Sequence, residues 1–119
     1  MSEHVYWVLE GLINPGKLDA FKALVEEMSA ATKANEPGAV AYEWSLSPDG
    51  TKFHILEHYK NSAATATHIK NFGAHFAARF LGLVTPTYMN VYGTPNHEVR
   101  EMLAGFGPSY YTHVAGFVR

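Results

Sequence analysis

The stretch FHILEHYKNSAATATH, residues Phe53–His68, decides how this chain folds. Its first half places apolar or aromatic residues at every second position, which is typical of a strand with one buried face. Ser62 then stands where a helix N-cap is expected, ahead of an alanine-rich segment that predicts a helix over 63–70. A strand that runs into a helix brings a carboxylate, a phenol and an imidazole near one another, those of Glu57, Tyr59 and His68.

A second alternating segment, Val40–Leu46, precedes this strand, and the turn sequence SPDG joins the two into a predicted β-hairpin. If these four residues form the loop, the opposed pairs are Trp44 with Phe53, Tyr42 with Ile55, and Val40 with Glu57. A slip of one residue would pair the same row with His54, Leu56 and His58. The first register is preferred because it separates apolar from polar side chains, and it predicts an apolar face that carries a single carboxylate.

The first third of the chain reads as a strand and a long helix. Residues 4–13 are apolar on both faces, as expected of a strand that is covered on both sides. Asn14-Pro15-Gly16 breaks this strand, with Asn14 as the expected N-cap and Pro15 at the first helical position. The apolar spacing that follows predicts one amphipathic helix, which ends before Pro37.

After the helix over 63–70, we expect an interruption at Gly73, a continuation over Ala74–Leu83, and a strand over Thr87–Gly93. The resulting order βαββαβ predicts the ferredoxin-like α+β class with an antiparallel sheet. We therefore expect residues 1–93 to form the core of one domain.

Residues 94–119 are predicted to be a helix and strand extension of the same domain. Thr94 is the expected N-cap of a short helix, with Pro95 at its first position. Alternation over 110–118 predicts a fifth strand, which we expect to reach across a dimer.

Composition excludes several classes of protein. The chain has 119 residues, a net charge of −2 and no basic cluster, which argues against binding to nucleic acid or to anionic membranes. It has no cysteine, so disulfides, thiolate nucleophiles and cysteine-bound metals are excluded. The N-terminus has no basic flank followed by an apolar run, and no stretch approaches the roughly 18 apolar residues of a membrane span. These features predict a cytoplasmic protein.

Two motifs resemble the antibiotic biosynthesis monooxygenase (ABM) family: Glu36-Pro37-Gly38 followed by Tyr42, and Glu57-x-Tyr59 followed nine residues later by His68. The resemblance spans residues 4–93. It implies a dimeric ferredoxin-like α+β barrel, a homodimer with facing sheets, in which the helix that carries His68 lines a cavity. The haem-degrading branch of the family is not matched, because Ala78 lies where its iron-ligating histidine would fall and the first strand offers no asparagine.

Neither a metal nor a cofactor is expected. The seven histidines form no HxH or HExxH motif. The glycines make no GxGxxG fingerprint, and no Walker loop is present. An oxidoreductase built on this sequence would resemble the cofactor-free branch of the ABM family.

We therefore predict a cofactor-free monooxygenase that acts on a small hydroxylated aromatic or quinol-like compound, with oxygen as the second substrate. His68, with an ordinary pKa of about 6.5, would take the phenolic proton with help from Glu57. The expected substrate contacts are Tyr42, Trp44, Phe53, Tyr59 and His75.

Structural roles are the alternatives for the same residues. His68 could be a half-buried helix histidine bonded to a backbone carbonyl, Glu57 could be a partner at an interface or a helix terminus, and the aromatic residues could be core. Two other functions also remain open: a non-catalytic small-molecule-binding or stress-response protein, and an isomerase or lyase that uses the same base.

Overall fold

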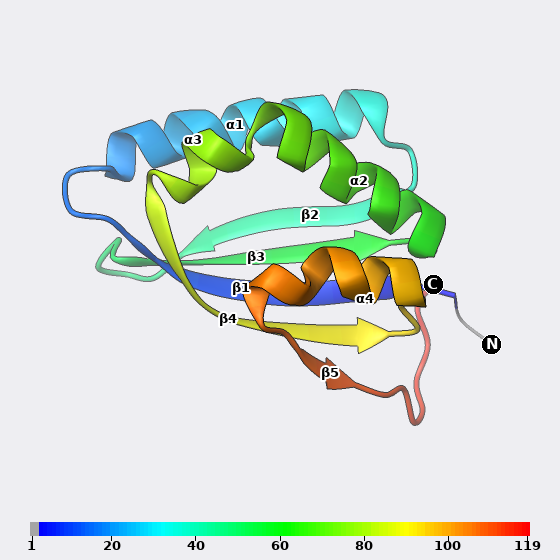
Figure 1. The fold of residues 1–119 in the computed structure, drawn as a ribbon. Coiled ribbons are helices and arrows are strands. Elements are labelled where there is room, and N and C mark those ends of the chain that lie inside the picture. The colour runs from blue at the N-terminus through cyan, green and yellow to red at the C-terminus, as the bar shows by residue number, and fades with distance from the viewer. Residues whose placement is uncertain (1–2) are drawn as a thin grey trace.

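The structure is a computed structural model that describes residues 3–119. Its strands are β1 (Val5–Ile13), β2 (Ala39–Leu46), β3 (Lys52–Tyr59), β4 (Val84–Gly93) and β5 (Ser109–Tyr111). Its helices are α1 (Leu18–Asn35), α2 (Ser62–His75), α3 (Ala77–Leu81) and α4 (His97–Leu103), followed by the 3-10 turn η1 (Ala104–Phe106). The sheet order is β2-β3-β1-β4-β5, and the helices lie together on one face of the sheet (Figure 1). The predicted ferredoxin-like α+β class is confirmed.

The β2–β3 hairpin has the predicted face but not the predicted register. Tyr42 pairs with Glu57 and Trp44 with Ile55, a shift of two residues from the expected pairs. The cause is the turn, where the Asp49 carboxylate accepts hydrogen bonds from the Ser47 hydroxyl and from the backbone and hydroxyl of Thr51, so that the loop is longer than four residues. Because a shift of two residues returns every side chain to the same face, the aromatic row still lies opposite the apolar positions of β3.

The ends of α1 and α2 also differ from the prediction. Asn14 does not cap α1, which begins at Leu18 after a turn in which Gly16 has a φ of +77°. The cap of α2 is Asn61 and not Ser62, because the Asn61 side chain accepts a hydrogen bond of 2.8 Å from the backbone N–H of Ala64. The predicted break at Gly73 is wrong as well, since α2 continues to His75 and the chain turns at Phe76.

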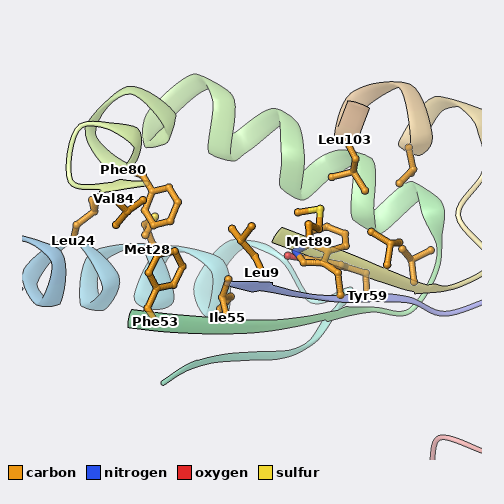
Figure 2. Close-up of a cluster of buried hydrophobic side chains, with 14 of the residues drawn as sticks. Leu9, Leu24, Met28, Phe53, Ile55, Tyr59, Phe80, Val84, Met89 and Leu103 are labelled. Atoms are coloured by element: carbon orange, nitrogen blue, oxygen red, sulfur yellow. The ribbon is translucent and has the colours of Figure 1, made fainter. Parts of the chain in front are cut away.

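Alternate residues of the sheet face the helices and form the core (Figure 2). On β1 the buried positions are Val5, Trp7 and Leu9, while Tyr6 and Val8 lie on the other face and are half-buried. In a single chain the helices cover only one face of this strand, although it was predicted to be covered on both. The opposite face of the sheet is open (Figure 1).

The C-terminal extension packs on the core through α4. Val99 and Leu103 are fully buried, and Asn96, not Thr94, caps the helix by accepting a hydrogen bond from the backbone N–H of Val99. β5 is shorter than the strand predicted over 110–118: it has three residues, runs parallel to β4, and is followed by exposed residues 112–119. Within residues 3–119 no helix is long and apolar enough to cross a bilayer.

Candidate functional site

A cavity of about 50 Å³ lies between the sheet and the helices. The strands contribute Trp7, Leu9, Tyr42, Trp44, Ile55, Glu57 and Met89 to its wall. The helical side contributes His68, Ile69, Phe72, Phe80, Leu103 and Phe106. Leu103 and Phe106 belong to the C-terminal extension, so this extension forms part of the wall. The lining is apolar except for a few groups, among which Glu57 and His68 are the acid and the base.

Glu57 is held in place by three donors, although it lies on the apolar face of β3 and is only 7% exposed. The indole N–H of Trp7 donates to its Oε2 at 2.8 Å, and the hydroxyl of Tyr59 donates to its Oε1 at 2.6 Å. His68 Nε2 lies 3.1 Å from the same Oε1. These hydrogen bonds compensate for the loss of water around the buried carboxylate.

A second carboxylate holds the other side of the His68 ring. His68 Nδ1 lies 2.9 Å from Oε1 of Glu36, which follows the last residue of α1 and is also buried. The amide of Asn71, one turn along α2, donates to the other oxygen of Glu36 at 3.3 Å. The imidazole therefore lies between two carboxylates, and we call Glu36, His68 and Glu57 the buried triad.

The buried triad changes the acid strength of His68. Burial alone would lower the pKa of His68, because it disfavours the charged imidazolium. The hydrogen bonds and negative charges of Glu36 and Glu57 outweigh burial and raise the pKa to about 9. At neutral pH the ring is therefore protonated and donates to both carboxylates. The ordinary pKa expected from the sequence is wrong, because that expectation did not include Glu36.

The predicted site residues fall into two groups. Glu57, His68, Tyr42 and Trp44 all line the cavity, and the Tyr42 ring lies 5.5 Å from the His68 ring. The remaining three, Phe53, Tyr59 and His75, are absent from the lining.

Each residue of the second group has a different position. Phe53 is fully buried in the core between Phe21 and Phe80, and Tyr59 lies behind Glu57, to which it donates. His75 is exposed at the end of α2. These positions favour supporting roles for Phe53 and Tyr59, and they leave His75 away from the cavity.

Trp7 and Glu36 were not among the site residues predicted from the sequence. Trp7 meets Glu57 because β1 and β3 pair with Trp7 directly opposite Glu57, and this pairing requires the strand order of the sheet. Glu36 belongs to the Glu36-Pro37-Gly38 motif, which from the sequence indicated only the family and the end of a helix. One signal in the sequence could have pointed to Glu36. It is a carboxylate at the end of a helix, and a later strand carries a second carboxylate, that of Glu57.

Tyr42 and Trp44 bring two further polar groups to the wall. Burial, followed by the negative charge of Glu57, raises the pKa of Tyr42 well above its usual range, so its phenol stays protonated. The indole nitrogen of Trp44 is buried and has no hydrogen-bond partner.

The model of the antibiotic biosynthesis monooxygenase family matches residues 8–79, more than half of the chain. The chain belongs to this family. The ABM resemblance drawn from the sequence is thus confirmed. No curated protein matches the chain.

Solved structures with the ABM fold superpose on the chain. MupZ from Pseudomonas fluorescens does so with a TM-score of 0.86 and 24% identity, covering 99% of this chain and 96% of that one. SnoaB, a cofactor-independent oxygenase from Streptomyces nogalater, has a TM-score of 0.66 and 16% identity, covering 80% of this chain and 96% of that one. At these identities the similarity establishes the fold, and the chemistry has to be argued from the residues of the cavity.

Proposed function

We propose that this ABM family member is a cofactor-free monooxygenase that oxidises a small hydroxylated aromatic or quinol-like compound in the cavity. The supporting observation is the buried triad, which places an imidazolium and a carboxylate in contact on the wall of an apolar cavity. The name of the structurally similar SnoaB, a cofactor-independent oxygenase, points in the same direction.

The buried triad offers an acceptor for a proton of the substrate. A protonated His68 between two carboxylates leaves one excess negative charge in an apolar surrounding. In this proposal a hydroxyl group of the substrate gives its proton to Glu57, the negative charge moves to the substrate oxygen in the same cavity, and the adjacent His68 imidazolium offsets that charge. This assignment exchanges the roles expected from the sequence: Glu57 accepts the proton, and His68 orients Glu57 and stabilises its charge.

The deprotonated substrate then supplies the electrons. All four electrons needed to reduce oxygen come from the substrate: one oxygen atom forms a new C=O group on the ring, and the other leaves as water with two hydrogens of the substrate. Apolar residues such as Phe72, Met89 and Leu103 exclude bulk water from the reduced ring. A cavity of about 50 Å³ is smaller than an aromatic ring requires, so substrate entry must move part of the lining outward.

Aerobic oxygen uptake with a panel of quinols and hydroxylated naphthalenes tests the proposal. We expect His68→Gln to lower turnover about 10²–10⁴-fold, the usual cost of losing a positioned acid–base group. His75→Gln is the matched control, and we expect its turnover to stay within about twofold because His75 is exposed and away from the cavity. Full turnover in His68→Gln on an oxidised substrate would refute the role of the buried triad.

Proton transfer without oxygen is the second candidate function, that of an isomerase or lyase. It is favoured by one observation, the contact of 3.1 Å between His68 Nε2 and Glu57, which offers a donor and an acceptor to the same ligand. Conversion of a substrate under anaerobic conditions, with no oxygen uptake in air, would favour this candidate over oxygenation.

We further propose that a second copy of the chain covers the open face of the sheet. This face carries a row of stacked rings across four strands, with centroids 5.0–5.4 Å apart: His58, Tyr6, Tyr92 and Tyr111. Leu56 and Tyr88 add apolar surface that is about 40% exposed. Sedimentation at micromolar concentration should give the mass of a dimer, and a monomer mass would refute the proposal.

A further inference from the structure

Trp44 carries a buried donor with no acceptor. Within residues 3–119 its Nε1 is the one buried side-chain nitrogen or oxygen without a hydrogen-bond partner. Buried polar groups in folded proteins are nearly always paired, because an unpaired group loses water and gains nothing in return. This donor belongs to a residue that lines the cavity, so a ligand in the cavity is a candidate for the missing acceptor.

Aromatic rings pack around Trp44 on several sides. Its ring packs against those of Phe21, Phe53 and Phe80 at centroid distances of 5.7–5.8 Å. Tyr42, on the same strand, closes a further side at 5.8 Å. An indole N–H can only donate, so the acceptor must be an oxygen or another group with a free lone pair.

Tyr42 is a neighbour that could compete for this donor. Its hydroxyl interacts with Thr32, and the Trp44 indole N–H lies near enough to act on the pKa of Tyr42 as a weak hydrogen-bond donor, the smallest of the causes that act on it. The distance and angle between the two groups nevertheless do not satisfy a hydrogen bond, since Nε1 is left without a partner. The donor is therefore available to a ligand.

We propose that the Trp44 N–H positions the substrate by donating to a carbonyl oxygen, while a hydroxyl group of the same substrate lies at Glu57. This inference rests on the proposed use of the cavity as the substrate site, and it does not depend on which reaction follows. Glu57 is directly opposite Tyr42, and Trp44 lies two residues further along β2. Glu57 and Trp44 are thus diagonal neighbours, with backbone positions about 7–8 Å apart.

This arrangement is the basis of the proposed substrate class. Trp44 and Glu57 both line the cavity from neighbouring strands, so one ligand can meet the N–H of the first and the carboxylate of the second. The substrate is therefore a ring with a hydroxyl group on one side and a carbonyl group on the other. A ring without the carbonyl leaves Trp44 unpaired and binds more weakly.

Two matched ligands test the proposal: 4′-hydroxyacetophenone, and 4-ethylphenol, in which CH₂ replaces the carbonyl group. We expect the wild type to prefer the ketone in calorimetric titrations. Trp44→Phe, which removes the N–H and keeps an aromatic ring, should weaken ketone binding about threefold to tenfold and change 4-ethylphenol binding less than about twofold. The ligands differ in acidity, but this difference is the same in both proteins and cancels in the comparison.

An NMR measurement keeps the test independent of how well Trp44→Phe folds. The chain has two tryptophans and therefore two indole N–H signals. The Trp7 signal should lie downfield because its N–H donates to Glu57. The Trp44 signal should move downfield when the ketone is added and not when 4-ethylphenol is added, whereas the Trp7 signal should respond alike to both ligands, because the hydroxyl of either one reaches Glu57.

Each other outcome of these measurements overturns the proposal. These outcomes are a Trp44 signal that does not move at millimolar ketone, a Trp44 signal that moves equally with both ligands, and a loss of affinity for both ligands in Trp44→Phe. The Trp44 signal could also lie downfield without ligand and move upfield in Tyr42→Phe. This result would show that the Trp44 N–H donates to the Tyr42 hydroxyl, and it would refute the proposal. A ketone-dependent shift in a protein that consumes no oxygen with any quinol would refute the oxygenase function and leave the role of Trp44 intact.

Discussion

The two faces of the sheet place adjacent residues in opposite environments. Glu57 and His58 are consecutive on β3, yet Glu57 lies under the helices with His68, whereas His58 lies on the open face, stacked on Tyr6 at 5.0 Å. Their neighbours on β1 are divided in the same way, since Trp7 pairs with Glu57 and Tyr6 pairs with His58. The alternation of a strand therefore assigns one residue to the cavity and the next to the open face.

The two faces shift histidine pKa values in opposite directions. On the covered face, carboxylates overcome burial and raise the pKa of His68 to about 9. On the open face, partial burial and then the neighbouring His4 lower the pKa of His58, and no carboxylate among residues 3–119 opposes them. Burial acts in the same direction on both rings, so the presence of an acidic partner decides the sign of the shift.

The largest effect on the covered face should come from truncation after Gly93. This removes Val99 and Leu103, whose burial is worth about 3–6 kcal/mol together, and it opens the cavity. We expect a large fall in melting temperature and a loss of dimer stability. Truncation after Tyr111 is the control, because it removes only the exposed residues 112–119. Equal melting temperatures for the full chain and the chain truncated after Gly93 would show that α4 is not part of the core.

Glu36→Gln should have the next largest effect. It removes one of the two carboxylates at His68, and loss of one partner of a buried pair costs about 3 kcal/mol or more. The pKa of His68 should also fall, and NMR titration of the ring measures this change directly. Glu27→Gln is the matched control, since it breaks a solvent-screened, exposed pair with Arg79 and should leave the stability almost unchanged. Similar losses in the two variants would mean that the buried triad contributes no more than a surface ion pair.

A more gradual effect should be the dependence of stability on pH. The folded-state pKa of His68 lies above its unfolded value of about 6.5, so the stabilisation is complete below pH 6.5 and is lost as the pH rises through 9. The loss should reach about 3 kcal/mol. Thermal melting at pH 6, 7.5 and 9.5, taken as the difference between the wild type and His68→Gln, isolates this contribution from the other titrating groups.

His58 should act with the opposite sign in the same experiment. Because its pKa is lowered in the folded state, its contribution is present above the unfolded pKa and is lost as the pH falls. The difference between the wild type and His58→Gln should therefore appear only in acid. An effect of His58 on the alkaline side would contradict the comparison of the two faces.

Local patterns predicted most of the fold and part of the site. Period-2 alternation located the hairpin strands, and helical spacing located α1, because both patterns reflect which side chains must be buried. The same alternation placed Glu57, Tyr42 and Trp44 on one face, where they line the cavity with His68. The pairing register was not predictable, since it depends on hydrogen bonds that Asp49 makes inside the turn.

The sequence by itself determined the order of the elements, the buried face of each strand and the family motif, because these depend on neighbouring residues. Only the tertiary structure decided the chemistry of the site. It brought Glu36 to His68 from 32 residues away and Trp7 to Glu57 from 50 residues away, and it left the Trp44 N–H without an acceptor. Acid strength and hydrogen bonding depend on which groups lie within a few ångströms of one another, and for distant residues this is fixed only when helices and strands pack together.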